Sequence, residues 1–418
     1  MDKKILKQLK NAKAAEETFG LLSLSKRNKI LKNLARLIKK NKKSILSANT
    51  KDLKRMKKDD PMYDRLVLND KRIEGMIKEI NNLSKMPDPI GEIFDERKGP
   101  GIEIKKKRVP LGVVAVIYES RPNVTTDVAA ICIKSGNVAV LKGGKEARES
   151  SLALHKLIQK SLEESRVSKE AVQLIDPKIK NAAESIISAD GWIDLIVPRG
   201  SERLIKFVRE NAIVPVIETG AGVCHTFVDE SAKLDDSAKI IFNAKTERPS
   251  VCNALDTAVI HEKISEKFIP KMAQLLSKKD VEIFADSKSY KILEKVYPVK
   301  LLRRAQESDF GKEFLSLKMS VKIVSDFNEA LRFIKKYSSH HSEAILTENK
   351  KNAERFLKEI DAATVYVNAS TRFSDGAIFG LGSEIGISTS KLHARGPMGP
   401  KEMTTYKWLV SGKYSVRK

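Results

Sequence analysis

Residues 112–147 read GVVAVIYESRPNVTTDVAAICIKSGNVAVLKGGKEA, and this stretch decides the fold class. Short apolar runs recur within it and after it, each of the length of a strand buried on both faces. A well-patterned amphipathic helix, 149–165, separates the second run from the third. This alternation predicts a parallel sheet with helices on both sides. The four runs occupy residues 112–118, 137–141, 192–197 and 214–218.

A second series of the same kind follows Pro249. Its expected helices, 325–337 and 350–360, carry apolar residues at helical spacing between charged ones. We therefore expect an α/β protein in which two parallel-sheet domains meet near residue 250. The expected strands are 256–260, 321–324, 343–347 and 364–367.

The first 110 residues follow other patterns. Residues 1–90 are helical in pattern, with a clear apolar stripe on a basic helix at Ile30, Leu34 and Leu37. Residues 91–110 carry a Lys-Gly-Pro-Gly turn signal at 98–101 between alternating segments, which indicates an exposed β-hairpin. A lone hairpin is marginal in water, so we expect it to pack on another subunit, together with the tail after about residue 400.

Composition excludes several classes of protein. The 418 residues carry 78 basic and 54 acidic side chains, a net charge of +24, but only 6% are aromatic. The lysines are dispersed and stacking platforms are scarce, so a solvated basic surface is favoured over nucleic-acid binding. Charges interrupt the most apolar region and fill the N-terminal segment, so we expect neither a membrane span nor a secretion signal.

The three cysteines point to a reducing compartment, here the cytoplasm, because their number is odd and none forms a CxxC pair. Cys132 is flanked by apolar residues and is expected in the core. Cys224 abuts His225, but neighbours on a strand face opposite ways, so a structural role is favoured. No spacing of histidines and carboxylates is typical of a metal site.

Cys252 is the most suggestive reactive residue. It lies in RPSVCNAL, residues 248–255, on an expected loop at the crossing between the two domains. Arg248 or a backbone N–H could lower the pKa of a thiol there and favour the nucleophilic thiolate. The alternative is a small buried hydrophobic side chain, and spacing alone leaves both open.

Two glycine-containing turns follow predicted strands and open helices. LKGGKEA covers 141–147 and VPRGS covers 197–201. Both would place cations and backbone N–H groups where a helix N-terminus meets an anion, which suggests a nucleotide site. Neither is a GxGxxG fingerprint, and either alone is also an ordinary turn.

Taken together, these stretches resemble the aldehyde dehydrogenase superfamily, and within it the branch that reduces L-glutamyl 5-phosphate to L-glutamate 5-semialdehyde in proline biosynthesis. The resemblance covers nearly the whole chain. It implies an aldehyde dehydrogenase-like α/β fold, NADPH as cofactor and Cys252 as nucleophile. The segments that carry it are 109–147, 194–201, 243–261, 370–389 and 391–399.

The resemblance also assigns roles to the residues around the nucleophile. An oxyanion donor is expected in ESRPN, where Ser120 takes the position of the usual asparagine and Asn123 lies nearby; Asn123 could equally be a helix N-cap. Arg121, Arg372 and Arg395 are candidate clamps for the carboxylate or phosphate of the substrate, with structural ion pairs as the alternative.

For the cofactor, the resemblance implies contacts from both turns. Lys142 is expected at the adenosine ribose, and Lys145 beside the 2′-phosphate, unless it is simply an exposed lysine. Arg199 and Gly200 are expected near the pyrophosphate and the nicotinamide. Glu384 is expected to hold the nicotinamide ribose.

Two further motifs depart from the family pattern. His341 matches a family histidine, but His340 stands where glycine is common, which puts a role for His341 in doubt. Glu218 lies in ETGAG, which resembles the segment whose glutamate activates water in aldehyde oxidisers.

The resemblance divides the chain into an NADPH-binding domain (1–90 and 110–248), a catalytic domain (249–395) and an oligomerisation segment (91–109 and 396–418). The active site is expected in the crevice between the domains. The expected partners are a second copy of the chain and glutamate 5-kinase, without nucleic acid or membrane. The rival hypotheses are an aldehyde oxidiser of the same superfamily and a catalytically silent basic scaffold.

Overall fold

The structure, a computed structural model, describes residues 1–60 and 62–417, which form two compact units. Unit 1 comprises Met1–Thr219, Phe379–Gly386 and Leu392–Lys418, and unit 2 comprises Gly220–Ile378 and Ile387–Lys391. The division after Thr219 differs from the expected one at residue 248. The reason lies in the strand at Cys224–Val228, which pairs with strands of the second sheet and so carries its segment into unit 2.

Unit 1 contains a four-stranded, all-parallel sheet in the order β5-β4-β3-β6. The sequence predicts three of these strands, whereas the run at 214–218 forms only a bridge between Ile196 and Val216. Ile117 of β3 lies opposite Lys142 of β4, and Tyr118 of β3 lies opposite Arg199 of β6. Because these strands are parallel, their carboxyl ends lie together at one edge of the sheet, here called the strand edge. The strands are β3 (Val113–Tyr118), β4 (Val138–Lys142), β5 (Val172–Leu174) and β6 (Leu195–Arg199).

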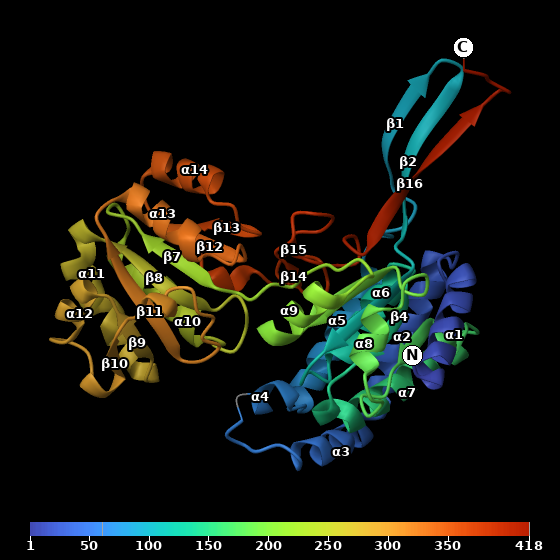
Figure 1. Ribbon diagram of the computed structural model, residues 1–418, viewed down its shortest axis with the longest axis horizontal. Coiled ribbons are helices and arrows are strands. Elements are labelled where there is room, and N and C mark those ends of the chain that lie inside the picture. Colours follow the sequence, from blue (N-terminus) through green and yellow to red (C-terminus); the bar gives the residue numbers. More distant parts are fainter. Residues whose placement is uncertain (61, 418) are drawn as a thin grey trace. The chain divides into compact units, whose positions relative to one another are not determined.

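Helices surround this sheet and share one hydrophobic core with it (Figure 1). The predicted stripe on α2 is confirmed, since Ile30, Leu34 and Leu37 are all buried. The helices are α1 (Lys3–Phe19), α2 (Leu24–Lys40), α3 (Lys42–Leu53), α4 (Tyr63–Leu66), α5 (Asp70–Lys85), α6 (Val124–Lys134), α7 (Arg148–Glu164), α8 (Ala182–Ile187) and α9 (Glu202–Asn211), with short 3₁₀ turns η1 (Lys145–Ala147) and η2 (Lys169–Ala171).

A three-stranded antiparallel sheet, here called the arm, extends from the rest of unit 1 (Figure 1). The predicted hairpin is present as β1 (Ile93–Gly99) and β2 (Ile102–Pro110), turning at Pro100 and Gly101. The C-terminal strand β16 (Thr404–Gly412) pairs with β2 along its whole length. The tail therefore completes this sheet within its own chain.

Unit 2 contains a seven-stranded parallel sheet in the order β10-β9-β11-β8-β7-β12-β13. The four strands expected after Pro249 are present, and the parallel-sheet α/β class is confirmed in both units. The strands are β7 (Cys224–Val228), β8 (Leu255–His261), β9 (Glu282–Ala285), β10 (Leu302–Arg304), β11 (Lys318–Val324), β12 (Ser342–Leu346) and β13 (Thr364–Val367); two-residue strands β14 (Ile387–Ser388) and β15 (Gly396–Pro397) lie near the C-terminus.

The sheet of unit 2 has a hydrophobic core on each face. Side chains alternate along its strands, so Val228 joins the core beneath α10–α12 while its neighbour Phe227 joins the core beneath α13 and α14. The helices are α10 (Leu234–Thr246), α11 (Glu262–Leu276), α12 (Ser287–Leu293), α13 (Phe327–Tyr337) and α14 (Lys350–Glu359), with 3₁₀ turns η3 (Ser277–Lys279), η4 (Val299–Leu301), η5 (Glu307–Asp309) and η6 (Thr371–Phe373).

Two kinds of feature are absent from residues 1–60 and 62–417. No helix in these ranges combines the length and apolar character needed to cross a bilayer. In the same ranges, no three histidine, cysteine or acidic side chains gather as metal ligands would.

Candidate functional site

Cys252 lies in unit 2, on the loop between α10 and β8, as the sequence predicts. Its side chain is partly exposed, whereas Cys132 and Cys224 are fully buried. Burial raises the pKa of the Cys132 thiol to about 12 and holds that of Cys224 well above its ordinary value. Of the three thiols, Cys252 is therefore the one placed to act as a nucleophile.

The backbone of Cys252 is tightly packed. The Cys224 thiol donates to its carbonyl oxygen over 3.3 Å. A Cβ atom added to Gly222 would lie 2.7 Å from the Cys252 Cα and overlap its carbonyl group. Position 222 must therefore be glycine for the loop to take this path.

A buried polar network lies behind this loop in unit 2. His341 Nδ1 is 2.9 Å from the Ser342 hydroxyl and 4.0 Å from Cys224 Sγ. The neighbouring His225 is fully buried against Glu343; burial opposes its charging, but this carboxylate outweighs burial and raises the pKa of His225. Sequence reasoning left His341 doubtful, and the structure places it in this network.

A second buried pair, which the sequence analysis missed, joins α10 to β8. The Lys245 ammonium lies 3.8 Å from the Asp256 carboxylate, and both side chains are almost fully buried. Burial raises the pKa of Asp256 to about 7 and lowers that of Lys245. Asp256 also accepts the backbone N–H groups of Cys224 and Phe314, so the pair ties the strands beneath the Cys252 loop together.

The cofactor candidates of unit 1 gather at the strand edge described above. Lys142 ends β4 and Arg199 ends β6, on either side of β3. Gly386 approaches Arg199 so closely that an added Cβ would lie 3.0 Å from its Nη1 atom, which brings the segment of Glu384 to this edge. Lys145 is exposed in η1.

The same edge offers donors for an anion. Arg199 Nε is buried and has no hydrogen-bond partner among the residues that the structure describes. Ser201 caps α9, and its backbone N–H donates to the Glu119 carboxylate over 2.7 Å. Because the Ser201 N–H is already bound to a carboxylate, the orphaned Arg199 Nε is the observation at this edge that fits a dinucleotide phosphate.

The two oxyanion candidates are both engaged in unit 1. The Ser120 backbone N–H and hydroxyl donate to Glu146 over 2.5 and 2.8 Å, and Ser120 itself has a left-handed backbone, φ 41°. Asn123 stands at the N-cap of α6 but makes no side-chain cap; its amide donates to Asp127 over 2.7 Å. Burial raises the pKa of Asp127 well above its ordinary value.

The three candidate arginines are divided between the units. Arg121 and Arg395 belong to unit 1, whereas Arg372 belongs to unit 2 together with Cys252. The Arg372 guanidinium donates through Nε to Glu247 over 3.1 Å and through Nη1 to the Asn253 side chain. Asn253 directly follows Cys252, and no motif in the sequence marks it as a functional residue.

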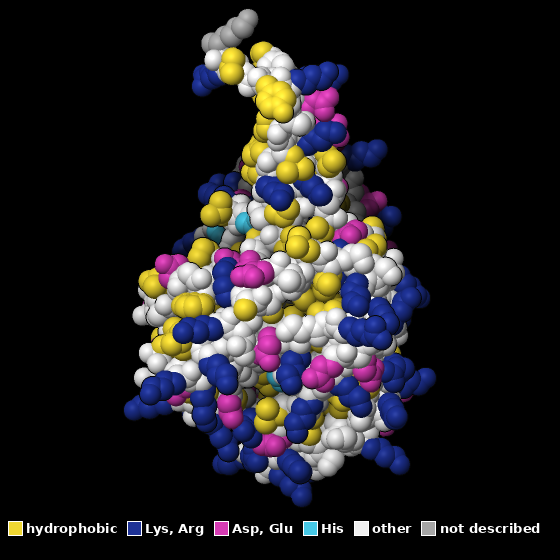
Figure 2. All heavy atoms as spheres, turned by 90° about the vertical axis from the view of Figure 1, so that its right-hand side faces the viewer, with side chains coloured by type: hydrophobic (Ala, Val, Ile, Leu, Met, Phe, Trp, Pro, Cys, Tyr) yellow, Lys and Arg dark blue, Asp and Glu magenta, His cyan; other side chains and the backbone are white. Residues whose placement is uncertain are grey.

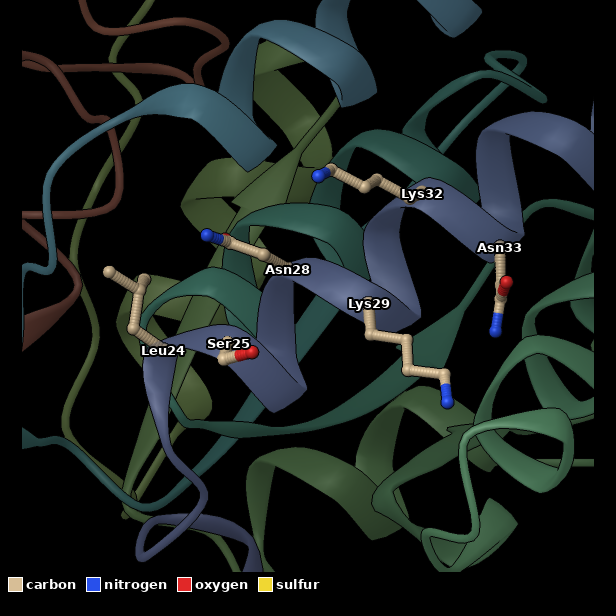
Figure 3. A pocket seen from close by; sticks show the side chains of 6 residues that line it. All are labelled: Leu24, Ser25, Asn28, Lys29, Lys32 and Asn33. Carbon is tan, nitrogen blue, oxygen red and sulfur yellow. The ribbon is translucent and has the colours of Figure 1, made fainter.

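A surface pocket of about 600 Å³ lies along α2 in unit 1 (Figure 3). Its lining residues all come from this one helix, and none is a candidate site residue. They are Leu24, Ser25, Asn28, Lys29, Lys32 and Asn33.

Comparison with known proteins gives consistent matches. Residues 2–288 match the model of the aldehyde dehydrogenase family. The chain is 49% identical over 419 residues to gamma-glutamyl phosphate reductase of Chlorobium phaeobacteroides, and 47% identical over 418 residues to that of Legionella pneumophila, with all of each chain covered. The crystal structure of gamma-glutamyl phosphate reductase from Thermotoga maritima superposes with a TM-score of 0.92 at 43% identity, covering 99% of this chain and 100% of the other.

Proposed function

The chain belongs to the aldehyde dehydrogenase family, and from this premise we propose that it reduces L-glutamyl 5-phosphate to L-glutamate 5-semialdehyde, with release of phosphate. This reaction is a step of proline biosynthesis from glutamate. The observation that carries the proposal is the partly exposed Cys252 thiol on a tightly fixed loop, in a chain similar to such reductases over its whole length.

Cys252 performs the covalent chemistry. Its thiolate attacks the acyl carbon, a C–S bond forms, and the C–O bond to the phosphate breaks, so that phosphate leaves with the electron pair. A bound nicotinamide supplies the hydride that this carbon accepts. The C–S bond then breaks, Cys252 regains its thiolate, and the aldehyde is released.

The cofactor binds at the strand edge of unit 1. Lys142 would hold the adenosine ribose, Arg199 and Gly200 the pyrophosphate and nicotinamide, and Glu384 the nicotinamide ribose. The orphaned Arg199 Nε supports this assignment, because a buried guanidinium nitrogen without a partner is costly unless a ligand satisfies it.

We expect a preference for NADPH over NADH. Lys145 is exposed at the start of the helical segment after β4, where it can pair with a 2′-phosphate. Lys145→Glu should lower the ratio of kcat/KM for NADPH to that for NADH by about tenfold, the effect of losing one charge-assisted hydrogen bond. Lys160→Glu, which makes the same charge change at an exposed position of α7, is the control and should leave this ratio unchanged. Equal kcat/KM values for the two cofactors in the unmodified enzyme would contradict the assignment.

The substrate presents a carboxylate, an ammonium and an acyl phosphate. Arg121, Arg372 and Arg395 supply planar guanidinium groups that bind carboxylate or phosphate through two parallel hydrogen bonds. The oxyanion of the tetrahedral intermediate takes donors from the Cys252 backbone N–H and from Ser120 or Asn123. Ser120 would have to exchange its Glu146 partner for the substrate oxygen to take this role.

Glu218 is not a catalytic base in this proposal. Its carboxylate lies 3.6 Å from Arg209 Nη1. The thioester is discharged by hydride or, in reverse, by phosphate, and neither needs a deprotonated water. Glu218→Gln should therefore keep phosphate-dependent activity within about one order of magnitude, under ~1.4 kcal/mol of transition-state stabilisation. A loss as large as that of Cys252→Ala would show that Glu218 activates the thiol or the substrate.

The arm supports a proposal of homo-oligomerisation. Large hydrophobic side chains on it are exposed, among them Phe94, Trp408 and Val410. Figure 2 shows hydrophobic side chains along the arm. Lys and Arg side chains are instead spread over the visible face, which favours a solvated basic surface over a nucleic-acid site. Glutamate 5-kinase is a further proposed partner, since it makes the acyl phosphate. The proposed location of the enzyme is the cytoplasm.

The test is the reverse reaction. Purified enzyme is given glutamate 5-semialdehyde, NADP⁺ and inorganic phosphate, and NADPH formation is followed by its absorbance. We expect turnover that requires phosphate. Turnover independent of phosphate would instead identify an aldehyde oxidiser, and no turnover with salt-sensitive gel retardation of nucleic acid would identify a basic scaffold.

A further inference from the structure

Asn253 joins the nucleophile loop to a distant turn of unit 2. Its side chain is only 4% exposed. The amide nitrogen donates to the carbonyl oxygens of Ser374, over 2.8 Å, and Arg372, over 3.4 Å. The amide oxygen accepts from Arg372 Nη1. Within the described part of the chain, every hydrogen bond of the Asn253 side chain therefore goes to the segment that carries Arg372.

The main chain of Asn253 meets the same segment. Its carbonyl oxygen accepts the Thr371 hydroxyl over 2.8 Å. The segment is itself fixed to the sheet, since the Ser374 hydroxyl lies 2.6 Å from that of Tyr366 in β13 and 2.8 Å from that of Ser342 in β12. The turn is thus held against the Cys252 loop from one side and against the sheet from the other.

These contacts orient the Arg372 guanidinium. Nε is bound to Glu247 and Nη1 to Asn253, so two bonds from different segments fix the plane of the group. The side chain is 14% exposed, and a guanidinium has five N–H donors, so donors beyond these two remain for an anion. Asn253 forms one of these two bonds, and a single peptide bond links it to Cys252.

We propose that Asn253 is a positioning residue, which holds the Arg372 guanidinium at a set place relative to Cys252 Sγ. The substrate anion bound by Arg372 then lies where the acyl carbon meets the thiolate. The inference rests on the proposed function, because it takes Arg372 as an anion clamp and Cys252 as the nucleophile. It adds a residue that acts through Arg372 and not on the reacting atoms themselves.

The reverse reaction separates the two anions that Arg372 could bind, since the carboxylate enters with glutamate 5-semialdehyde and the phosphate enters by itself. Arg372→Ala should raise the KM of one of these two substrates, and that substrate identifies the bound anion. Asn253→Ala should raise the same KM by about tenfold and change kcat by less than about threefold, because the guanidinium remains but loses its orientation.

A double-mutant cycle tests whether Asn253 acts through Arg372. If it does, the variant carrying both Asn253→Ala and Arg372→Ala has the KM of Arg372→Ala alone, since no guanidinium is left to orient. If the two substitutions damage the structure independently, the increase in KM of the double variant would instead be the product of the two single increases. Asn352→Ala is the control: it removes a partly buried amide hydrogen bond to Asp229 elsewhere in unit 2 and should leave both KM values within about twofold.

NADPH binding and the melting temperature are measured for each variant to establish that it is folded, and Asn253→Ser replaces Asn253→Ala if the latter does not fold. Any of three results would overturn the inference. They are a KM of the double variant raised by the product of the two single effects, a rise for Asn253→Ala in the KM that Arg372→Ala leaves unchanged, and a loss for Asn253→Ala in kcat alone. If only the inference about Asn253 is wrong, the unmodified enzyme still shows phosphate-dependent turnover. If the proposed function is wrong, the unmodified enzyme shows none.

Discussion

Cys252→Ala should abolish turnover, with a loss of at least about four orders of magnitude in kcat, because no covalent intermediate can form without the thiol. NADPH binding should persist, since the cofactor candidates Lys142 and Arg199 belong to unit 1 and Cys252 to unit 2. The measurements are the phosphate-dependent formation of NADPH and a fluorescence titration with NADPH. Near-normal activity in this variant would refute the thioester route.

Labelling with iodoacetamide provides an independent readout of the same residue. Modification should concentrate on Cys252, which is partly exposed, and spare Cys132, whose pKa burial raises to about 12. Cys132→Ala is the control variant and should retain both labelling and turnover. Equal labelling of Cys132 and Cys252 in the folded enzyme would contradict the reading of the site.

Gly222→Ala should have the second-largest effect, a loss of at least about 100-fold in kcat/KM. The added methyl group would overlap the backbone of Cys252, which must then move, and displacement of a reacting group by about 1 Å is enough for a loss of this size. The rate of Cys252 alkylation should change with it, because the thiol is carried on the displaced backbone.

The matched control is Gly75→Ala in α5, where an added Cβ meets nothing within 4 Å. This variant should keep full activity and gain stability, by up to about 1 kcal/mol, since alanine favours the helix interior. Activity of Gly222→Ala within threefold of the unmodified enzyme would show that the loop tolerates displacement and that its packing does not set the reaction geometry.

Local patterns predicted many of the individual helices and strands but not how the strands group into sheets. Buried parallel strands are continuous apolar runs, so 112–118 and 137–141 were predictable one by one. The boundary between the two units was not predictable in this way, because β7 joins the second sheet by pairing with β12, which lies more than 100 residues later. Several strands were missed, among them β5, β7, β9 and β10; β5, β9 and β10 are three or four residues long, too short to form a marked apolar run.

The candidate site shows the same contrast. The motif around Cys252 indicated the nucleophile, but whether that thiol is exposed depends on how the loop packs against Gly222 and Cys224. The contacts of Asn253 reach residues about 120 positions away, and no local spacing encodes them.

By itself, the sequence determined the α/β class, the hairpin and the family, and it singled out Cys252 as the candidate nucleophile, because periodicity and motifs are properties of neighbouring residues. Only the tertiary structure decided which thiol is accessible, where Ser120 and Asn123 direct their donors, and that Asn253 holds Arg372. These depend on hydrogen bonds and burial between segments distant in the chain, which form only when the sheets bring those segments together.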